Sequence, residues 1–204
     1  MKKLLVTGCN GQLGREINKK YAGRDDIELI NTDVDELDIT NIDEVTKLME
    51  EVKPYAIINC AAHTAVDKCE VDGDNAYKIN AIGPRNLSIA ATKVGAKMVH
   101  ISTDYVFAGD GTEPYTEFDQ VNPKSMYGRT KLAGEEFVKQ FADKYFIIRT
   151  AWLYGDGKNF VKTMLGLSEK YDEINVVCDQ VGSPTSTAVL ADIIDELVWT
   201  DNYG

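Results

Sequence analysis

The sequence predicts an α/β fold in which a parallel sheet is doubly wound and helices cover both of its faces. Short apolar runs rich in β-branched residues alternate with helical patterns along the chain, which indicates repeated βαβ units. Sheets built from such units are covered on both faces. Three glycines, Gly8, Gly11 and Gly14, lie between the first apolar run and the first helical pattern. A doubly wound sheet binds its ligand at such a turn.

Each expected element follows from a local pattern. Apolar runs bounded by polar residues predict strands at residues 3–7, 27–31, 55–60, 97–102, 145–150 and 174–177. Helical spacing predicts helices at residues 12–21, 41–52, 74–94, 125–141, 160–170 and 187–199. Thr40 can cap the second helix, and Gly95 stops the third. We expect the last helix to return to the sheet.

The glycine series predicts a phosphate-binding turn of the Rossmann type. Glycines leave room for the backbone to turn tightly and for phosphates to reach the N-terminal amides of the helix that follows. The spacing Gly-x-x-Gly-x-x-Gly departs from the GxGxxG form, and glycines in an ordinary strand-to-helix turn are the alternative. Asp33, at the end of the second predicted strand, can accept hydrogen bonds from adenosine ribose hydroxyls and would repel a 2′-phosphate.

A tyrosine and a lysine four residues apart predict the chemistry of the site. Tyr127 and Lys131 lie on one face of the helix expected at 125–141. The ammonium would favour phenolate, so we expect it to lower the pKa of Tyr127 towards the working pH. Thr103, just after a predicted strand, would supply a hydroxyl beside the phenol. A solvated surface pair is the alternative.

Composition limits the classes of partner. The chain has 204 residues and a formal net charge of −11, with no long acidic block, which argues against nucleic acid or an anionic membrane surface as the main partner. No apolar segment is long enough to cross a bilayer. The four cysteines lack CxxC spacing, which is typical of reduced thiols in a cytoplasmic protein and not of a zinc site or a disulfide framework.

Five stretches carry a resemblance to a known family. They are CAAHTAVDKCE at 60–70, ISTDYVFAGDG at 101–111, YGRTKLAGE at 127–135, RTAWLYG at 149–155 and DQVGSPTST at 179–187. In this order they resemble the dTDP-4-dehydrorhamnose reductases, a family within the extended short-chain dehydrogenase/reductase superfamily. The similarity extends over essentially the whole chain.

The resemblance implies an oxidoreductase that uses NADPH or NADH to reduce the C4 keto group of dTDP-4-dehydro-L-rhamnose, giving dTDP-L-rhamnose for cell-surface polysaccharide synthesis. Tyr127 would donate the proton, Lys131 would tune the phenol and bind the nicotinamide ribose, and Thr103 would polarise the carbonyl. Some members of the family form a metal-bridged dimer, so a homodimer of this chain is a further expectation.

The resemblance further implies two sets of binding residues. Those for the cofactor are Gly8, Asn10, Gly11, Gln12, Leu13, Gly14, Asp33, Asp38, Ile39, Ala61, Ala62 and Asn80, together with Tyr127 and Lys131. Those for the substrate are Val66, Thr103, Asp104, Tyr105, Trp152, Asn159 and Phe160. Turn, packing and helix-capping roles are the alternatives for these residues. No metal is expected, because Ala188 stands where some members of the family have the second of two acidic ligands, although Glu16 fits the first.

The resemblance also sets the expected domain organisation. Residues 1–150 form the NAD(P)-binding Rossmann domain, and residues 151–204 form part of a smaller substrate lobe. The family continues beyond the position of Gly204, so we expect weak turnover from this length of chain. Three alternatives stay open: an epimerase, a 4,6-dehydratase or a regulatory subunit that binds the cofactor without turnover. Dehydratases have Asp-Glu after the threonine, whereas this chain has Asp104 and Tyr105.

Overall fold

Five of the predicted strands form one parallel sheet. The structure is a computed structural model that describes residues 1–204. The strands are β1 (Lys2–Thr7), β2 (Ile27–Thr32), β3 (Ala56–Asn59), β4 (Lys97–Thr103) and β5 (Tyr145–Thr150), in the order β2-β1-β3-β4-β5. Every neighbouring pair is parallel, so all five carboxyl ends meet at one edge. The predicted doubly wound Rossmann-type fold is confirmed.

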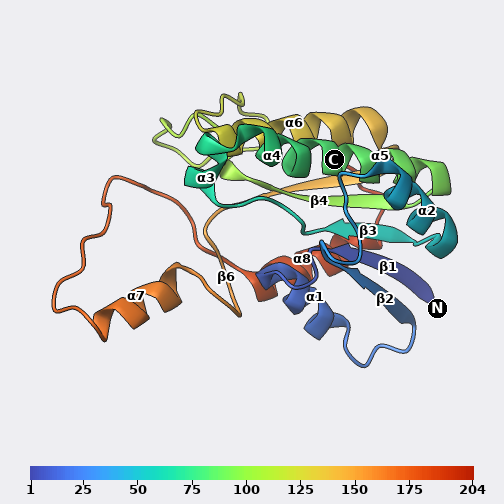
Figure 1. The fold of residues 1–204 in the computed structure, drawn as a ribbon, viewed down its shortest axis with the longest axis horizontal. Helices are drawn as coiled ribbons and strands as arrows, with labels where there is room; N and C mark the ends of the chain where they lie inside the picture. Colours follow the sequence, from blue (N-terminus) through green and yellow to red (C-terminus); the bar gives the residue numbers. More distant parts are fainter.

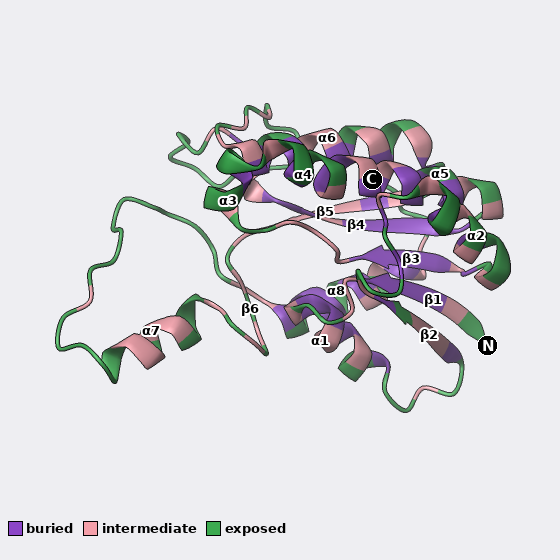
Figure 2. Cartoon of the chain, in the orientation of Figure 1, coloured by how far each residue is buried: buried purple, intermediate pink, exposed green.

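Helices cover both faces of this sheet (Figure 1). One face is covered by α1 (Gln12–Tyr21) and α8 (Thr187–Val198), and the other by α2 (Ile42–Val52), α5 (Gly83–Val94) and α6 (Met126–Phe141). The central strands β1, β3 and β4 are largely buried between the two layers, the outer strands β2 and β5 are mostly half-buried, and the outer helix faces are exposed (Figure 2). No helix combines the length and the apolar composition needed to cross a membrane.

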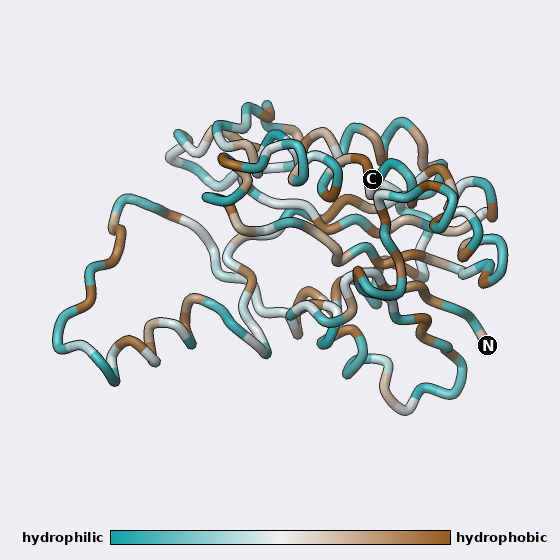
Figure 3. The backbone as a smooth tube through the Cα atoms, in the orientation of Figure 1, coloured by the Kyte–Doolittle hydropathy of each residue, from teal (hydrophilic) through white to brown (hydrophobic).

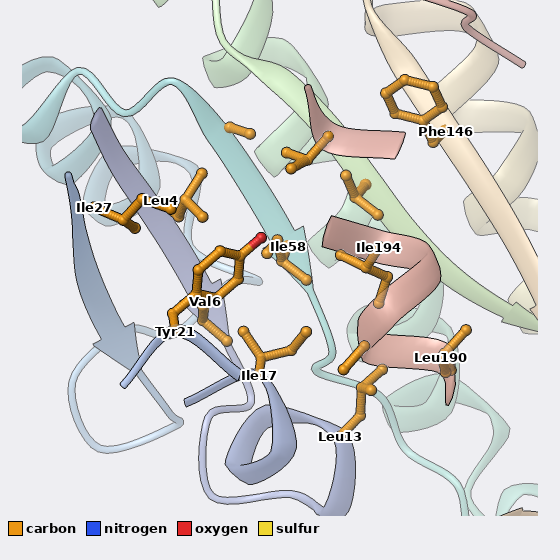
Figure 4. Close-up of a cluster of buried hydrophobic side chains, with 14 residues drawn as sticks. Leu4, Val6, Leu13, Ile17, Tyr21, Ile27, Ile58, Phe146, Leu190 and Ile194 are labelled. Atoms are coloured by element: carbon orange, nitrogen blue, oxygen red, sulfur yellow. The ribbon is translucent and has the colours of Figure 1, made fainter. Parts of the chain in front are cut away.

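The last helix belongs to the core of the sheet. Leu190 and Ile194 of α8 pack in one cluster with Ile17 of α1 and with Val6 and Ile58 of the central strands (Figure 4). The chain then returns to the outermost strand, β5, where the amide of Ile147 donates to the carbonyl of Gly204 at 2.8 Å. The return of this helix to the sheet is therefore observed.

The long helix expected at 74–94 is present, but it contains a π-helical segment. The structure has α3 (Val66–Val71) and α4 (Gly73–Tyr77), followed by a π-helical segment (Lys78–Ile82) that leads directly into α5. Asn41, and not Thr40, caps α2, because its side chain accepts from the amides of the first turn. The cap prediction was wrong by one residue.

The region after β5 departs most from the predictions. The strand expected at 174–177 is absent, because that segment is largely exposed and has no neighbouring strand to pair with. Instead β6 (Leu153–Tyr154) pairs with β7 (Thr185–Ser186) in a small parallel sheet. Between them, α7 (Phe160–Ser168) and its flanking loops extend away from the main body (Figure 1). This arm carries several exposed apolar residues (Figure 3).

Candidate active site

The glycine loop joins β1 to α1 and lies against the end of β3. Gly8 has φ +65°, and a Cβ on it would lie 2.7 Å from the amide nitrogen of Ala61. A Cβ on Gly14 would lie 2.6 Å from the Cα of Cys9. Gly11 occupies the N-cap of α1, where no side chain binds the first-turn amides. Those amides therefore remain available to an anionic ligand.

A pocket of about 280 Å³ opens beside this loop. It is lined by seven of the residues predicted to bind the cofactor: Gly8, Gly11, Asp33, Asp38, Ile39, Ala61 and Ala62. The other lining residues were not predicted from the sequence; they are Thr7, Thr32, Val34, Leu37, Thr40, Cys60 and Ile79. Thr7, Thr32 and Cys60 sit at or just after strand ends, a position that could have identified them. Leu37 and Ile79 carry no such signal.

Asp33 is fixed at the mouth of this pocket. Its Oδ2 accepts from the amide of Asn10 at 3.0 Å, and its Oδ1 accepts from the amide of Val34 at 2.9 Å. The Glu36 carboxylate caps the amide of Asp33 itself. The second strand and the glycine loop thus hold this carboxylate in place before any ligand arrives.

Asp38 and Ile39 have separate roles in the wall of the pocket. The Asp38 carboxylate accepts from both the amide and the hydroxyl of Thr40, so it is a turn residue as well as a lining residue. Ile39 is buried, and a Cβ on Gly83 would press against its side chain. The glycine at the start of α5 therefore leaves room for this apolar wall.

Asn80 lies behind the pocket and not on its surface. It is fully buried, accepts from the amide of His63 at 2.8 Å and donates to the hydroxyl of Thr130 at 3.1 Å. The π-helical segment places it there, between the loop after β3 and helix α6. The remaining predicted cofactor residues, Asn10, Gln12, Leu13 and Gly14, belong to the glycine loop and the first turn of α1 but do not line the pocket.

Tyr127 is buried at the start of α6. Ser125 caps this helix, and a Cβ on Gly128 would lie 3.0 Å from the carbonyl carbon of Tyr105, so α6 packs closely on the turn after β4. The rings of Tyr105 and Tyr127 meet edge-on, with centroids 5.5 Å apart. Burial raises the pKa of Tyr127 to about 12, although the neighbouring Thr103 hydroxyl lowers it.

This result overturns the expected effect of the lysine on the tyrosine. Lys131 is 1% exposed, and its Nζ donates to the carbonyl of Ile101 at 2.6 Å. Burial lowers the pKa of Lys131 itself to about 8. The prediction that the ammonium brings the pKa of Tyr127 towards neutrality is wrong, because desolvation of the phenol outweighs the other effects. At neutral pH the phenol keeps its proton.

Thr103 ends β4 and points its hydroxyl into this site. The hydroxyl donates to the carboxylate of Asp104 at 3.0 Å and accepts from the amide of Tyr105 at 3.2 Å. Burial raises the pKa of Asp104, while its hydrogen bond with Thr103 lowers it. Thr103 and Tyr127, from different elements, are thus brought together as predicted.

The predicted substrate residues divide into two groups. Val66 and Tyr105 pack around Tyr127, and Asp104 bonds to Thr103. By contrast, Trp152 is 44% exposed with φ +46°, and Phe160 is 63% exposed at the start of the projecting arm. Asn159 caps α7, and its amide also reaches the side chain of Gln12 at 3.4 Å. In this structure Trp152 and Phe160 do not join the cluster around Tyr127.

The remaining histidine, cysteine and charged side chains lie mainly in the core. His100 is buried and shares a hydrogen bond with Asn59, so it has a structural place in the core. Of the cysteines, Cys69 is buried as expected for a small apolar residue, but Cys178 is exposed. All four are free thiols. The buried ion pair of Glu135 and Arg149 was not singled out in the sequence, because no spacing rule links residues on different elements.

Comparisons with known proteins identify the family. The model described as RmlD substrate binding domain matches residues 1–202. A spore coat polysaccharide biosynthesis protein, SpsK, from Bacillus subtilis is 45% identical over 97% of this chain and 70% of its own length. A dTDP-4-dehydrorhamnose reductase from Escherichia coli is 42% identical over 93% of this chain and 64% of its own length.

Solved structures agree with this assignment. A dTDP-4-dehydrorhamnose reductase from Clostridium acetobutylicum has a TM-score of 0.97 and 61% identity, covering 99% of this chain and 72% of that one. The reductase from Bacillus anthracis, solved in complex with NADP, has a TM-score of 0.96 and 50% identity, covering 100% of this chain and 73% of that one. The chain thus spans about two thirds to three quarters of these relatives' lengths. The chain belongs to the RmlD substrate binding domain family.

Proposed function

We propose that this chain carries out NAD(P)H-dependent reduction of the C4 keto group of dTDP-4-dehydro-L-rhamnose, giving dTDP-L-rhamnose. The observation that carries the proposal is the buried, protonated phenol of Tyr127 beside the hydroxyl of Thr103. These groups lie at the same sheet edge as the glycine-loop pocket. Relatives that carry the name of this reductase, one of them bound to NADP, support the substrate and the cofactor.

The residues present fit a dinucleotide. A Cβ would fill the cradle at Gly8, and the first turn of α1 offers amides that no side chain caps. Asp33 would bind the ribose hydroxyls, Ile39 would pack on the adenine, and Ala61 and Ala62 leave the groove open beyond them. When bound, the reduced nicotinamide supplies the hydride.

Tyr127 and Thr103 would handle the ketone. A pKa of about 12 keeps the phenol protonated across the physiological range, which is the state in which it can donate. The hydroxyl of Thr103 can rotate its proton from Asp104 towards the ketone oxygen, since its orientation is not fixed by the backbone. Two donors would then meet the oxygen on which negative charge develops.

Lys131 would hold the nicotinamide side of the site in place. Its charge lowers the pKa of Cys60, which lines the glycine-loop pocket, so the ammonium that α6 carries lies near the wall of that pocket. With a pKa of about 8, it is mainly cationic at neutral pH. A cation there favours the phenolate that forms once Tyr127 has given up its proton.

A specific observation argues against a dehydratase. That chemistry needs a second carboxyl group after the threonine, but Tyr105 occupies the position and packs edge-on against Tyr127. The site therefore has one carboxyl group, Asp104, and it is engaged by Thr103. Simple reduction suits this set of groups.

The free cysteines support a cytoplasmic location.

Replacement of Tyr127 by Phe tests the proposal. Loss of the donor should slow single-turnover reduction of the keto sugar by about 10²- to 10⁴-fold, the usual contribution of a general acid. NADPH and NADH binding, measured by fluorescence titration, should stay at the parental level. Tyr77→Phe, which removes a hydroxyl from a side chain that is 40% exposed on α4, is the matched control. A parental rate for Tyr127→Phe would refute the role of the phenol.

A further inference from the structure

Three charged side chains lie together inside the protein. Glu135 is fully buried, Lys131 is 1% exposed, and the Arg149 side chain is 18% exposed. Burying an ion is costly unless it is paired and hydrogen-bonded. Only the lysine has a role in the proposed reaction. The presence of the other two charges beside it therefore needs a reason.

Glu135 lies one helical turn beyond Lys131 on α6, so the two side chains share a face of the helix. The ammonium donates to a single neutral carbonyl, that of Ile101, which is weak compensation for a desolvated cation. Glu135 supplies negative charge near the ammonium and favours its charged form.

Among the groups that face Lys131, Glu135 raises its pKa most, and Cys60 acts in the same direction more weakly. Burial raises the pKa of the Cys60 thiol to about 12, so the thiol is neutral. His100, on β4, is fully buried, and burial together with the charge of Lys131 holds its pKa well below the ordinary value, so it is neutral as well. Tyr127, one turn earlier on α6, keeps its phenolic proton.

Arg149 limits what Glu135 can do. Its Nε donates to Oε1 of Glu135 at 2.9 Å and its Nη2 donates to Oε2 at 2.7 Å, a two-point contact from β5 to α6. The guanidinium also lies over the ring of Phe107 at 4.9 Å, and that ring stacks on Tyr115. Arg149 therefore fixes the carboxylate and neutralises part of its charge, while holding the loop that follows Thr103.

We propose that Glu135 and Arg149 are positioning residues that act through Lys131: Glu135 keeps the buried ammonium charged, and Arg149 sets how strongly it does so. The proposal rests on the role given to Lys131 in the proposed function. It predicts opposite effects from removing the two partners. Without the Glu135 charge, Lys131 faces an unpaired guanidinium and its pKa should fall below about 8. Without the Arg149 charge, Glu135 acts on Lys131 at full strength and the pKa should rise.

The direct test is an NMR titration of the lysine side chains, with ¹³C at Cε, in the protein without cofactor. The Lys131 signal is assigned by its loss in Lys131→Met. We expect a decrease of about one pH unit or more in Glu135→Gln and an increase in Arg149→Gln. Glu136→Gln, the same change at a neighbouring side chain that is 61% exposed, should leave the titration unchanged. Shifts in the same direction in both variants, or none in either, would overturn the proposal.

A second variant keeps the test decisive if Glu135→Gln does not fold with its arginine unpaired. The double variant Glu135→Gln/Arg149→Gln removes both charges, and its Lys131 pKa should lie below that of the parent. An unchanged value there counts against the proposal. In turnover assays, the loss of activity at high pH should move with the Lys131 titration in each variant. Because the titration needs no catalysis, it can succeed even if Tyr127→Phe shows that the proposed reaction is wrong.

Discussion

At the scale of single residues, we expect Asp33 to discriminate between the two nicotinamide cofactors. The amides of Asn10 and Val34 hold its carboxylate at the pocket mouth, and no lysine or arginine lines that pocket. A fixed anion there repels the 2′-phosphate that NADPH carries and NADH lacks. We therefore expect the repulsion of the 2′-phosphate to depend on where the Asp33 carboxylate is held, and not only on its charge.

Asp33→Asn should therefore improve NADPH binding relative to NADH. The amide keeps an acceptor for the ribose and removes the negative charge, so we expect the ratio of the two dissociation constants to change about tenfold, or about 1.4 kcal/mol. Fluorescence titration of both cofactors measures it. Asp35→Asn, the same charge change on an exposed neighbour that does not line the pocket, is the control. Equal weakening of both cofactors would show that Asp33 has only a structural role.

The spacing of Tyr127 and Lys131 predicts their positions but not their pKa values. The four-residue interval correctly placed both on α6, but their proton affinities depend on burial, which the interval does not contain. Desolvation acts on the phenol and the ammonium in opposite directions. The pKa of the Tyr127 phenol is therefore higher than the sequence indicated, and burial lowers the pKa of the Lys131 ammonium.

At the scale of elements, glycines set how closely α6 approaches the π-helical segment. A Cβ on Gly134 would collide with the carbonyl oxygen of Asn80, the residue that links His63 to Thr130. Gly134→Ala would force α6 outwards, and we expect a loss of about 1–3 kcal/mol in the free energy of unfolding. Urea denaturation measures the change.

Gly166→Ala is the matched control for that prediction. Gly166 also lies within a helix, α7, but nothing surrounds the position its Cβ would occupy. Alanine has the higher helix propensity, so this change should not reduce stability. Equal effects of the two substitutions would mean that the close approach at Gly134 does not limit the packing of α6.

At the scale of the whole molecule, α8 is the element that ties residues beyond 150 to the sheet. Ile194 is fully buried in the same cluster as the central strands, whereas Ile193 on the same helix is 41% exposed. Ile194→Ala should lower the free energy of unfolding by about 2–5 kcal/mol. Ile193→Ala should change it by no more than about 0.5 kcal/mol. Chemical denaturation measures both changes. Equal losses in the free energy of unfolding would show that α8 does not unfold together with the core.

The sequence by itself determined the features that depend on local pattern. Apolar runs and helical spacing identified the five strands of the main sheet and the helices α1, α2, α6 and α8, because each buries one side or both in a regular period. The glycine series and the strand ends identified the pocket edge, since parallel strands present their carboxyl ends together.

Only the tertiary structure decided the features that join distant segments. The π-helical segment within the helix expected at 74–94 holds Asn80 between His63 and Thr130, and residues 174–177 form no strand because they have no strand to pair with. The pairing of Glu135 with Arg149 and the proton affinity of Lys131 depend on burial and on neighbours from other elements. Desolvation and long-range contact act across the fold, and no local pattern records them.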